Sequence, residues 1–384
     1  MTRAPVHPAL LTWARERAGL PAEALARRFP KLRAWERGEA HPTLRQLEDY
    51  ARAVRVPLGY LFLPEPPEER LPIPDFRTLE GHPPRRPSPD LLETLYAAQE
   101  RQDWYRDFAR TLRLPEVDFV GTVGLEDPPH AVAARITERI GFDVRSRENY
   151  RTWEEALHDL VQRIEGSGVL VMTSGIVGAN THRKLDPQEF RGFALADRLA
   201  PLIFVNGADT KSAQMFTLAH ELAHLWLGTS AVSDAGPAPG GRHRREEVWC
   251  NKVAAELLVP REALREAVQP GEPVTEAVQR LTRRFKVSTL VILRRLLDLG
   301  TLERAEFEKV WETERARLQG MAEQRKDGGD FYRSALSRVS RRFARALVES
   351  TLEGHTLYRD AFRMLGVKKM ETFEEIARRV SIAH

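Results

Sequence analysis

The sequence predicts a helix-rich α+β protein. Two observations support this class: apolar residues recur at helical spacing along most of the 384 residues, and strand-like apolar runs occur only between residues 168 and 206. Apolar residues make up 42% and charged residues 30% of the chain, a mixture that builds packed cores and excludes wholesale disorder. A chain of this length is expected to form two or three domains.

Residues 1–66 are expected to form a module of short helices. Pro21 opens the second of these helices, Gly38 ends the third, and the Thr43 hydroxyl can cap the fourth. Residues 67–90 are predicted to be a linker, because prolines stiffen this stretch and charged residues keep it solvated.

Residues 91–270 are expected to form the mixed α/β part of the chain. Its three predicted strands are residues 168–172, 190–195 and 202–206, and its main helices are residues 89–112, 128–141, 152–165, 212–227 and 246–258. We expect the strand at 202–206 to hold an extended peptide by adding it to the sheet as a further strand. Residues 271–384 read as helices alone.

A His-Glu-x-x-His motif lies inside the helix predicted at 212–227. His220 and His224 are one turn apart on the same helix face, so both imidazoles can bind one Zn²⁺ ion. Glu221 points to the edge of that face, where it can act as the general base towards an attacking water. A catalytic zinc usually has three protein ligands, so a third is missing from this helix.

The next helix supplies the third ligand. Glu247 and Asn251 share one face of it with small Ala254, so this face can approach the first helix closely. We therefore assign the metal to His220, His224 and Glu247, at one Zn²⁺ per chain, with Mn²⁺ or another divalent ion as the alternative. The other candidates, Glu246, Glu256 and His243, lie off this face or before the helix.

The single cysteine, Cys250, excludes an intramolecular disulfide and a cysteine-cluster metal site. We expect it to be a small buried apolar residue, with thiolate ligation as the lesser alternative. No stretch has the roughly 18 consecutive apolar residues of a membrane span, and the N-terminus does not read as a signal peptide. These features predict a cytoplasmic protein with no membrane partner.

With these residues in hand, the chain resembles the ImmA/IrrE family of zinc metallopeptidases that carry an N-terminal XRE-type helix-turn-helix. The resemblance rests on residues 216–224 and 247–260, and it extends to residues 42–48, 61–64 and 73–78. It implies an XRE-like module at 1–66, a zincin-like peptidase domain at 91–270, Glu247 as metal ligand and Glu221 as general base. It also implies that the substrate is an XRE-type repressor, whose cleavage releases mobile-element or stress genes.

Two segments are candidates for contact with DNA. The first is the N-terminal module, but only Pro30 and Lys31 separate Phe29 from Leu32, where a turn and the start of a recognition helix are expected. A protein-docking module is therefore at least as good an interpretation. The second is a helix-turn-helix-like segment over 274–298, in which phosphates can contact Arg283, Arg284, Lys286, Arg294 and Arg295. A solvated basic face is the alternative there.

The sequence thus predicts a zinc-dependent endopeptidase joined to a helix-turn-helix module. The alternative is a DNA-binding regulator or antitoxin-like protein whose metal site is structural or vestigial. A fourth protein ligand at the metal would favour that regulator.

Overall fold

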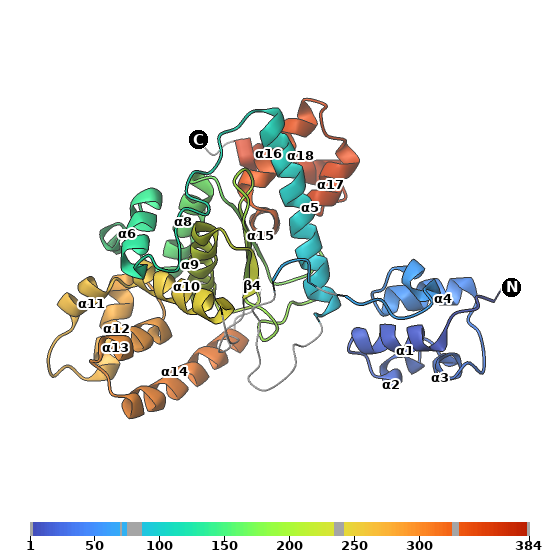
Figure 1. Cartoon of the computed structure of the whole chain (residues 1–384), viewed down its shortest axis with the longest axis horizontal. Helices are drawn as coiled ribbons and strands as arrows, with labels where there is room; N and C mark the ends of the chain where they lie inside the picture. Colours follow the sequence, from blue (N-terminus) through green and yellow to red (C-terminus); the bar gives the residue numbers. More distant parts are fainter. Residues whose placement is uncertain (1–2, 70, 75–86, 234–241, 325–329, 382–384) are drawn as a thin grey trace. The chain divides into compact units, whose positions relative to one another are not determined.

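The computed structural model describes residues 3–69, 71–74, 87–233, 242–324 and 330–381. The chain divides into two compact units, one made of residues 1–72 and 83–95 and the other of residues 73–82 and 96–384. Helices predominate and one four-stranded sheet is present, so the predicted α+β class is confirmed (Figure 1). Among the described residues, no helix is long and apolar enough to cross a membrane.

The first unit is built from short helices around one core. Leu10, Trp35 and Tyr50 are buried in this core. Thr43 caps a helix as expected, and the Gln46 side chain returns the bond to the Thr43 amide. The elements are α1 (Pro8–Arg17), α2 (Ala22–Ala26), α3 (Leu32–Glu36), α4 (Leu44–Ala53), the 3-10 helix η1 (Leu58–Phe62) and the start of α5 (Pro89–Thr111).

The second unit contains the sheet, whose strands lie in the order β1-β3-β2-β4. The strands are β1 (Leu170–Ser174), β2 (Gly192–Leu195), β3 (Leu202–Asn206) and β4 (Ala231–Ser233). β1 pairs with β3 in parallel, whereas β2 is antiparallel to both of its neighbours. The prediction that residues 202–206 take up a peptide is wrong, because β3 is paired on both sides and has no free edge. β4, which the sequence did not predict, is an edge strand.

The two faces of the sheet pack against different helices. Val171 and Ile203 belong to the core that also contains residues of α8 (Trp153–Gly166) and α9 (Lys211–Leu227). Figure 1 shows these two helices on one side of the sheet. On the other face the rings of Phe193 and Phe204 stack with their centroids 4.9 Å apart. The alternation along each strand is what a sheet buried on both faces requires.

Helices make up the rest of this unit. They are α6 (Pro129–Ile140), α7 (Val144–Glu148), α10 (Arg242–Leu258), α11 (Arg261–Ala267), α12 (Val274–Phe285), α13 (Thr289–Leu299), α14 (Arg304–Gln324), α15 (Phe331–Val339), α16 (Arg341–Leu352), α17 (Tyr358–Leu365) and α18 (Met370–Ser381). In the part of the chain that the structure describes, no strand follows β4, as the sequence predicted.

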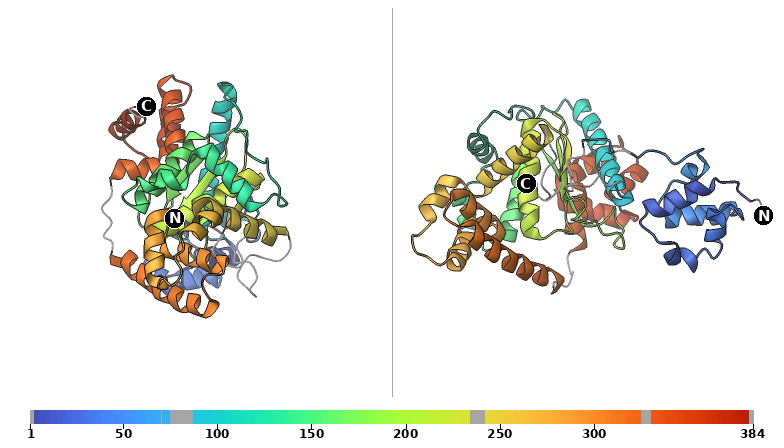
Figure 2. Two further views of the ribbon diagram at one scale, coloured as in Figure 1. Left: turned by 90° about the vertical axis from the view of Figure 1, so that its left-hand side faces the viewer. Right: turned by 60° about the horizontal axis from the view of Figure 1, so that its bottom comes forward.

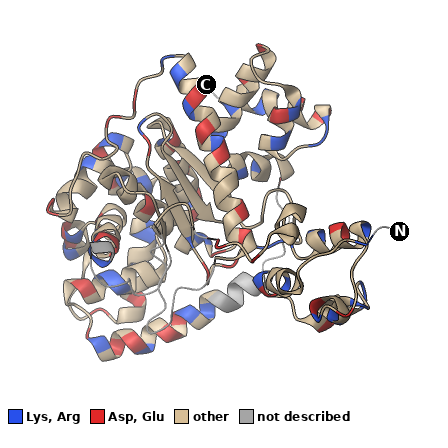
Figure 3. Ribbon diagram, turned by 45° about the vertical axis from the view of Figure 1, so that its right-hand side comes forward, with Lys and Arg blue, Asp and Glu red and all other residues tan. Residues whose placement is uncertain are grey.

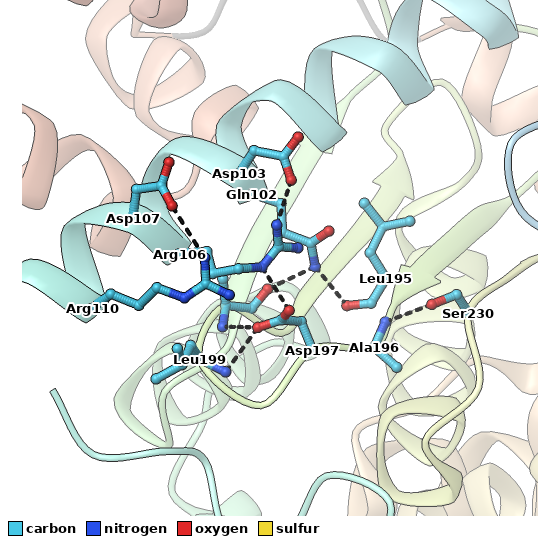
Figure 4. Close-up of polar contacts among 11 residues, drawn as sticks. Gln102, Asp103, Arg106, Asp107, Arg110, Leu195, Ala196, Asp197, Leu199 and Ser230 are labelled. Atoms are coloured by element: carbon cyan, nitrogen blue, oxygen red, sulfur yellow. Dashed lines mark hydrogen bonds and ion pairs between the residues drawn. The ribbon is translucent and has the colours of Figure 1, made fainter. Parts of the chain in front are cut away.

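The long helix α5 is fastened to the loop that joins β2 to β3 (Figure 4). The amide of Gln102 donates to the carbonyl oxygens of Leu195 and Ala200, at 3.0 and 2.8 Å. One turn further on, Arg106 pairs with Asp197 at 2.7 Å. This buried glutamine satisfies two carbonyls at the end of the sheet that no strand can reach.

Two glycines meet at the C-terminal end of α9. Gly228 ends the helix in the left-handed conformation, with φ of 75°. A Cβ atom on Gly228 would lie 2.8 Å from the Cα atom of Gly121. Beside this contact, the amides of Gly121 and Thr122 donate to the last carbonyls of the helix, those of Leu225 and Trp226. The close approach of the two backbones thus fixes where α9 stops.

Helix α13 packs against α11, α12 and α14, and Figure 2 shows these helices gathered at one end of the second unit. Ser288 caps α13 as predicted, since its hydroxyl accepts from the Val291 amide at 3.2 Å. Phe307 and Trp311 of α14 pack against the same core as α13. The surface of α14 carries both signs of charge in alternation, largely as ion pairs within the helix (Figure 3).

Candidate metal centre

Two helices, α9 and α10, bring together the three predicted ligands. His220 and His224 lie one turn apart on α9, and Glu247 lies on α10, which packs directly against it. Small residues make this close packing possible: Ala223 of α9 and Ala254 of α10 are both fully buried in the shared core.

The donor atoms of the three side chains converge. The Nε2 atoms of His220 and His224 are 3.1 Å apart, and the Glu247 carboxylate oxygens lie 3.2 and 3.1 Å from them. One donor atom from each residue falls within 4.8 Å of the others, and all three residues are buried. The predicted ligand set is therefore a real spatial cluster.

Each imidazole is held by a partner on its other nitrogen. His220 Nδ1 lies 3.1 Å from Oδ1 of Asn251, and His224 Nδ1 lies 3.0 Å from Oγ1 of Thr229. Asn251 can only accept through this oxygen, so in the neutral ring of His220 the proton belongs on Nδ1 and Nε2 has a free lone pair. Partners of this kind orient metal-binding histidines and fix their tautomer.

The charges of the cluster support one another. Burial lowers the pKa of His220, but the adjacent Glu247 carboxylate outweighs burial and raises that pKa to about 8. Burial also opposes ionisation of Glu247, yet the two histidines hold its pKa well below the usual range. A buried carboxylate kept ionised beside two imidazoles is a site prepared for a cation.

Glu221 lies beside the three ligands without joining them. It is fully buried, and neither carboxylate oxygen makes a hydrogen bond of good geometry among the described residues. Burial raises its pKa to about 8; the charge of Glu247 adds to this, while His220 and the Ser233 hydroxyl oppose it. A buried carboxylate that lacks a settled partner is rare and indicates a functional role.

Gly192 of β2 leaves the space that Glu221 occupies. A Cβ atom at this position would lie 2.6 Å from Cγ2 of Thr217, 2.8 Å from the Phe204 carbonyl oxygen and 3.0 Å from Oε1 of Glu221. Since a main-chain oxygen is one of these neighbours, the obstruction cannot be relieved by a rotamer change alone. The absence of a side chain here is what allows Glu221 its place.

The donor set fits a divalent metal ion. Two imidazole nitrogens and one carboxylate oxygen are the usual protein ligands of a catalytic zinc, and they leave a coordination position for a substrate or water. Among the described residues, the cluster of candidate ligands does not include Cys250, which is buried, so the thiolate alternative has no support.

At the other end of α10, two buried arginines donate to main-chain carbonyls at the ends of α10 and α12. Arg147 is fully buried and donates to the carbonyl oxygens of Leu258, at 2.5 Å, and Phe285, at 3.1 Å. Arg295 donates to the carbonyl oxygen of Val259 at 3.0 Å. Burial lowers the pKa of Arg147 to about 10, which still leaves it charged near neutral pH.

The five basic side chains predicted to contact phosphates do not share one environment in the structure. Arg295 is buried and paired with Glu256 at 2.7 Å, so it cannot reach a phosphate at the surface. Arg294 is exposed but paired with Asp298 at 3.2 Å. The three others, all at the C-terminal end of α12, have no ion-pair partner among the described residues: Arg283, Arg284 and Lys286.

Sequence reasoning missed the residues that support the ligands. The sequence indicated that Asn251 shares a helix face with Glu247. Its contact with His220 could not be predicted, because that contact depends on how closely α9 and α10 pack. Thr229 and Gly192 had no such signal, because their positions relative to His224 and Glu221 depend on the turn at Gly228 and on the pairing of β2.

Comparison with known proteins supports the divalent metal ion that the donor set fits. Residues 164–297 match a peptidase family model described as an IrrE N-terminal-like domain, and residues 339–379 match a domain of unknown function. The chain is also 33% identical over 101 residues to the radiation response metalloprotease IrrE of Deinococcus radiodurans. That match covers 25% of this chain and 31% of the relative, so the chain spans about a third of the relative's length.

Proposed function

We propose that this chain, whose residues 164–297 form a domain of the ImmA/IrrE metallopeptidase family, is a zinc-dependent endopeptidase acting on a protein partner. The observation that carries the proposal is the convergence of three buried donors, from His220, His224 and Glu247, beside the unsatisfied carboxylate of Glu221. We take the substrate to be an XRE-type repressor, so that proteolysis releases stress or mobile-element genes, in a cytoplasmic setting.

The residues divide the chemistry between them. When bound, the ion acts as a Lewis acid that polarises the scissile carbonyl and lowers the pKa of water. Asn251 and Thr229 keep the Nε2 atoms of the two histidines available as ligands. Glu221, buried and close by, accepts the proton of the attacking water and delivers it to the leaving amine nitrogen.

An extended substrate is best placed along β4. This strand is at the edge of the sheet, and Ser233 at its end lies beside Glu221. Because Ser233 accepts from the Arg191 amide, its neighbour Val232 directs its own backbone N–H away from β2. A peptide that adds to this edge through main-chain hydrogen bonds passes the general base.

The N-terminal module suits protein docking better than base reading. Its α3 has five residues, and the arginines within it and directly after it are both paired: Arg33 with Glu23 at 2.5 Å and Arg37 with Glu39 at 2.9 Å. A hollow of about 690 Å³ lies in the same unit. It is lined by His7, Pro8, Ala9, Thr12, Trp13, Glu16, Glu36 and Pro66.

Co-expression with an XRE-type repressor encoded beside the gene tests the proposal. The wild type should convert the repressor into fragments visible on a gel, and Glu221→Gln should reduce that conversion by about 10² or more. Glu126→Gln, the same replacement at an exposed position, is the matched control and should cleave like the wild type. A repressor fragmented equally by Glu221→Gln would contradict the assignment.

A DNA-binding regulator is the second candidate, and Arg283, Arg284 and Lys286, which no described acidic residue pairs, favour it. Any affinity they supply should be weakly sequence-dependent and should fall steeply with salt. Replacing all three by Gln should lower the salt slope measured by gel shift, by about 0.9 for each phosphate that is no longer neutralised. Arg33→Gln with Arg37→Gln is the matched control; if that control abolished selective binding, α3 would be the DNA reader.

A further inference from the structure

The edge of β4 that does not pair with β2 already makes a hydrogen bond to another segment of the same chain. The outward N–H of Val232 donates to the carbonyl oxygen of Pro74, at 3.1 Å. Ala231 and Val232 are fully buried and Ser233 is 3% exposed, although they form a terminal strand. We call residues 73–74 the strap.

The strap is contributed by a segment that otherwise builds the other unit. Residues 1–72 and 83–95 belong to the first unit, whereas Ile73 and Pro74 belong to the second, with the sheet. Ile73 is half-buried there. The strap therefore belongs to the unit that holds the sheet, as β4 does.

We propose that the strap is an internal ligand of the β4 edge and competes with an extended substrate for the Val232 N–H. The inference rests on the proposed function, since it takes β4 as the element that binds the substrate backbone. Each occupant needs the same donor, so the two exclude one another.

The composition of the strap makes it displaceable. Pro74 has no N–H, so it accepts one hydrogen bond from Val232 and cannot return one. An ordinary residue opposite Val232 in an antiparallel ladder exchanges two. A substrate strand thus gains a main-chain bond that the strap lacks. Prolines also protect sheet edges from unwanted pairing, and a merely protective strap is the outcome that the test must separate.

Hydrogen–deuterium exchange of the full chain tests the strap without turnover. In a Glu221→Gln background, Ile73→Gly with Pro74→Gly should speed exchange at the Val232 amide about tenfold, the equivalent of one hydrogen bond. The same variant should bind a synthetic peptide of residues 68–79 about tenfold more tightly, because the edge is free for more of the time. Added peptide should restore protection of the Val232 amide.

Leu63→Gly with Pro64→Gly is the matched control, since these exposed residues are the same kind of dipeptide and lie in the first unit. It should leave exchange and peptide binding unchanged. Ile73→Asp, which keeps Pro74, is the second variant if the double glycine fails to fold, and it should shift both readouts in the same direction. Equal Val232 exchange in the folded variants and control, or no gain in peptide affinity, overturns the proposal. Neither readout needs catalysis, so an inactive wild type would refute the peptidase and leave this result standing.

Discussion

The two ends of α10 bury polar groups in opposite ways. At its N-terminal end Glu247 meets His220 and His224, and the adjacent Glu221 has no settled hydrogen-bond partner. At its C-terminal end Arg147 and Arg295 donate to main-chain carbonyls that would otherwise be buried without a donor. The side chains at both ends are buried, and what differs is whether their polar atoms are satisfied.

This difference separates a functional site from a structural one. A buried polar group that is fully bonded offsets its loss of hydration and stabilises the packing around it. Converging donors and an unsatisfied carboxylate cost folding free energy unless something else completes them. We therefore expect substitutions at the first end to remove function while the fold persists, and substitutions at the second to lower stability.

The largest effect is expected at the ligands. His220→Ala should abolish the binding of about one divalent ion per chain, because a single imidazole and a carboxylate no longer make a catalytic donor set. Elemental analysis of protein purified without chelator measures the loss, and His130→Ala, at an exposed position on α6, should retain the ion. Metal-free wild-type protein would remove the basis of the assignment.

Arg147→Met should produce the largest loss of stability. It leaves the carbonyls of Leu258 and Phe285 buried without a donor, and each such group costs about 1–3 kcal/mol. Urea unfolding should therefore show a decrease of about 2–6 kcal/mol in the free energy of unfolding. Arg145→Met, on the exposed side of the same helix, should change it by less than about 0.5 kcal/mol. Similar losses from the two variants would mean that the buried guanidinium adds nothing.

Gly192→Ala tests the functional end without touching a ligand. The new methyl group must displace Glu221, Thr217 or the β3 backbone, and a misplacement of about 1 Å can lower kcat by about 10². The metal content should stay at the wild-type value. Gly166→Ala is the control, because a Cβ there meets nothing within 4 Å. An unchanged kcat would show that Glu221 tolerates movement.

The smallest effect is expected for the fold after chelation. The core joining the sheet with α9 and α10 is extensive, so this chain does not depend on the ion for folding as a zinc finger does. Peptidase activity should be lost and the far-UV circular dichroism should remain nearly unchanged. Unfolding on chelation would make the metal structural, which is one of the two forms of the regulator hypothesis.

Local chemistry made the helices and the clustering of the candidate ligands predictable. The His220–His224 spacing, the face that carries Glu247 and the Ser288 cap are all properties of single helices, and the structure bears each of them out. β4 was missed because three residues carry too little pattern, and β3 was misjudged because strand order depends on pairing across the chain. The burial of Arg295 likewise follows from α10 and α13 meeting, which no local spacing reveals.

The contact between Gly121 and Gly228 restricts how this protein can change through mutation. Gly228 turns the chain so that Thr229 reaches the ring of His224, and its Cα approach to Gly121 leaves no room for a side chain on it. A larger residue at 228 would require the two backbones to separate at a point where the amides of Gly121 and Thr122 bind the last carbonyls of α9. The orientation of the His224 imidazole thus depends on the close approach of two glycines. We therefore expect a substitution at position 228 to be tolerated only in a protein in which residues 121–123 have already changed position.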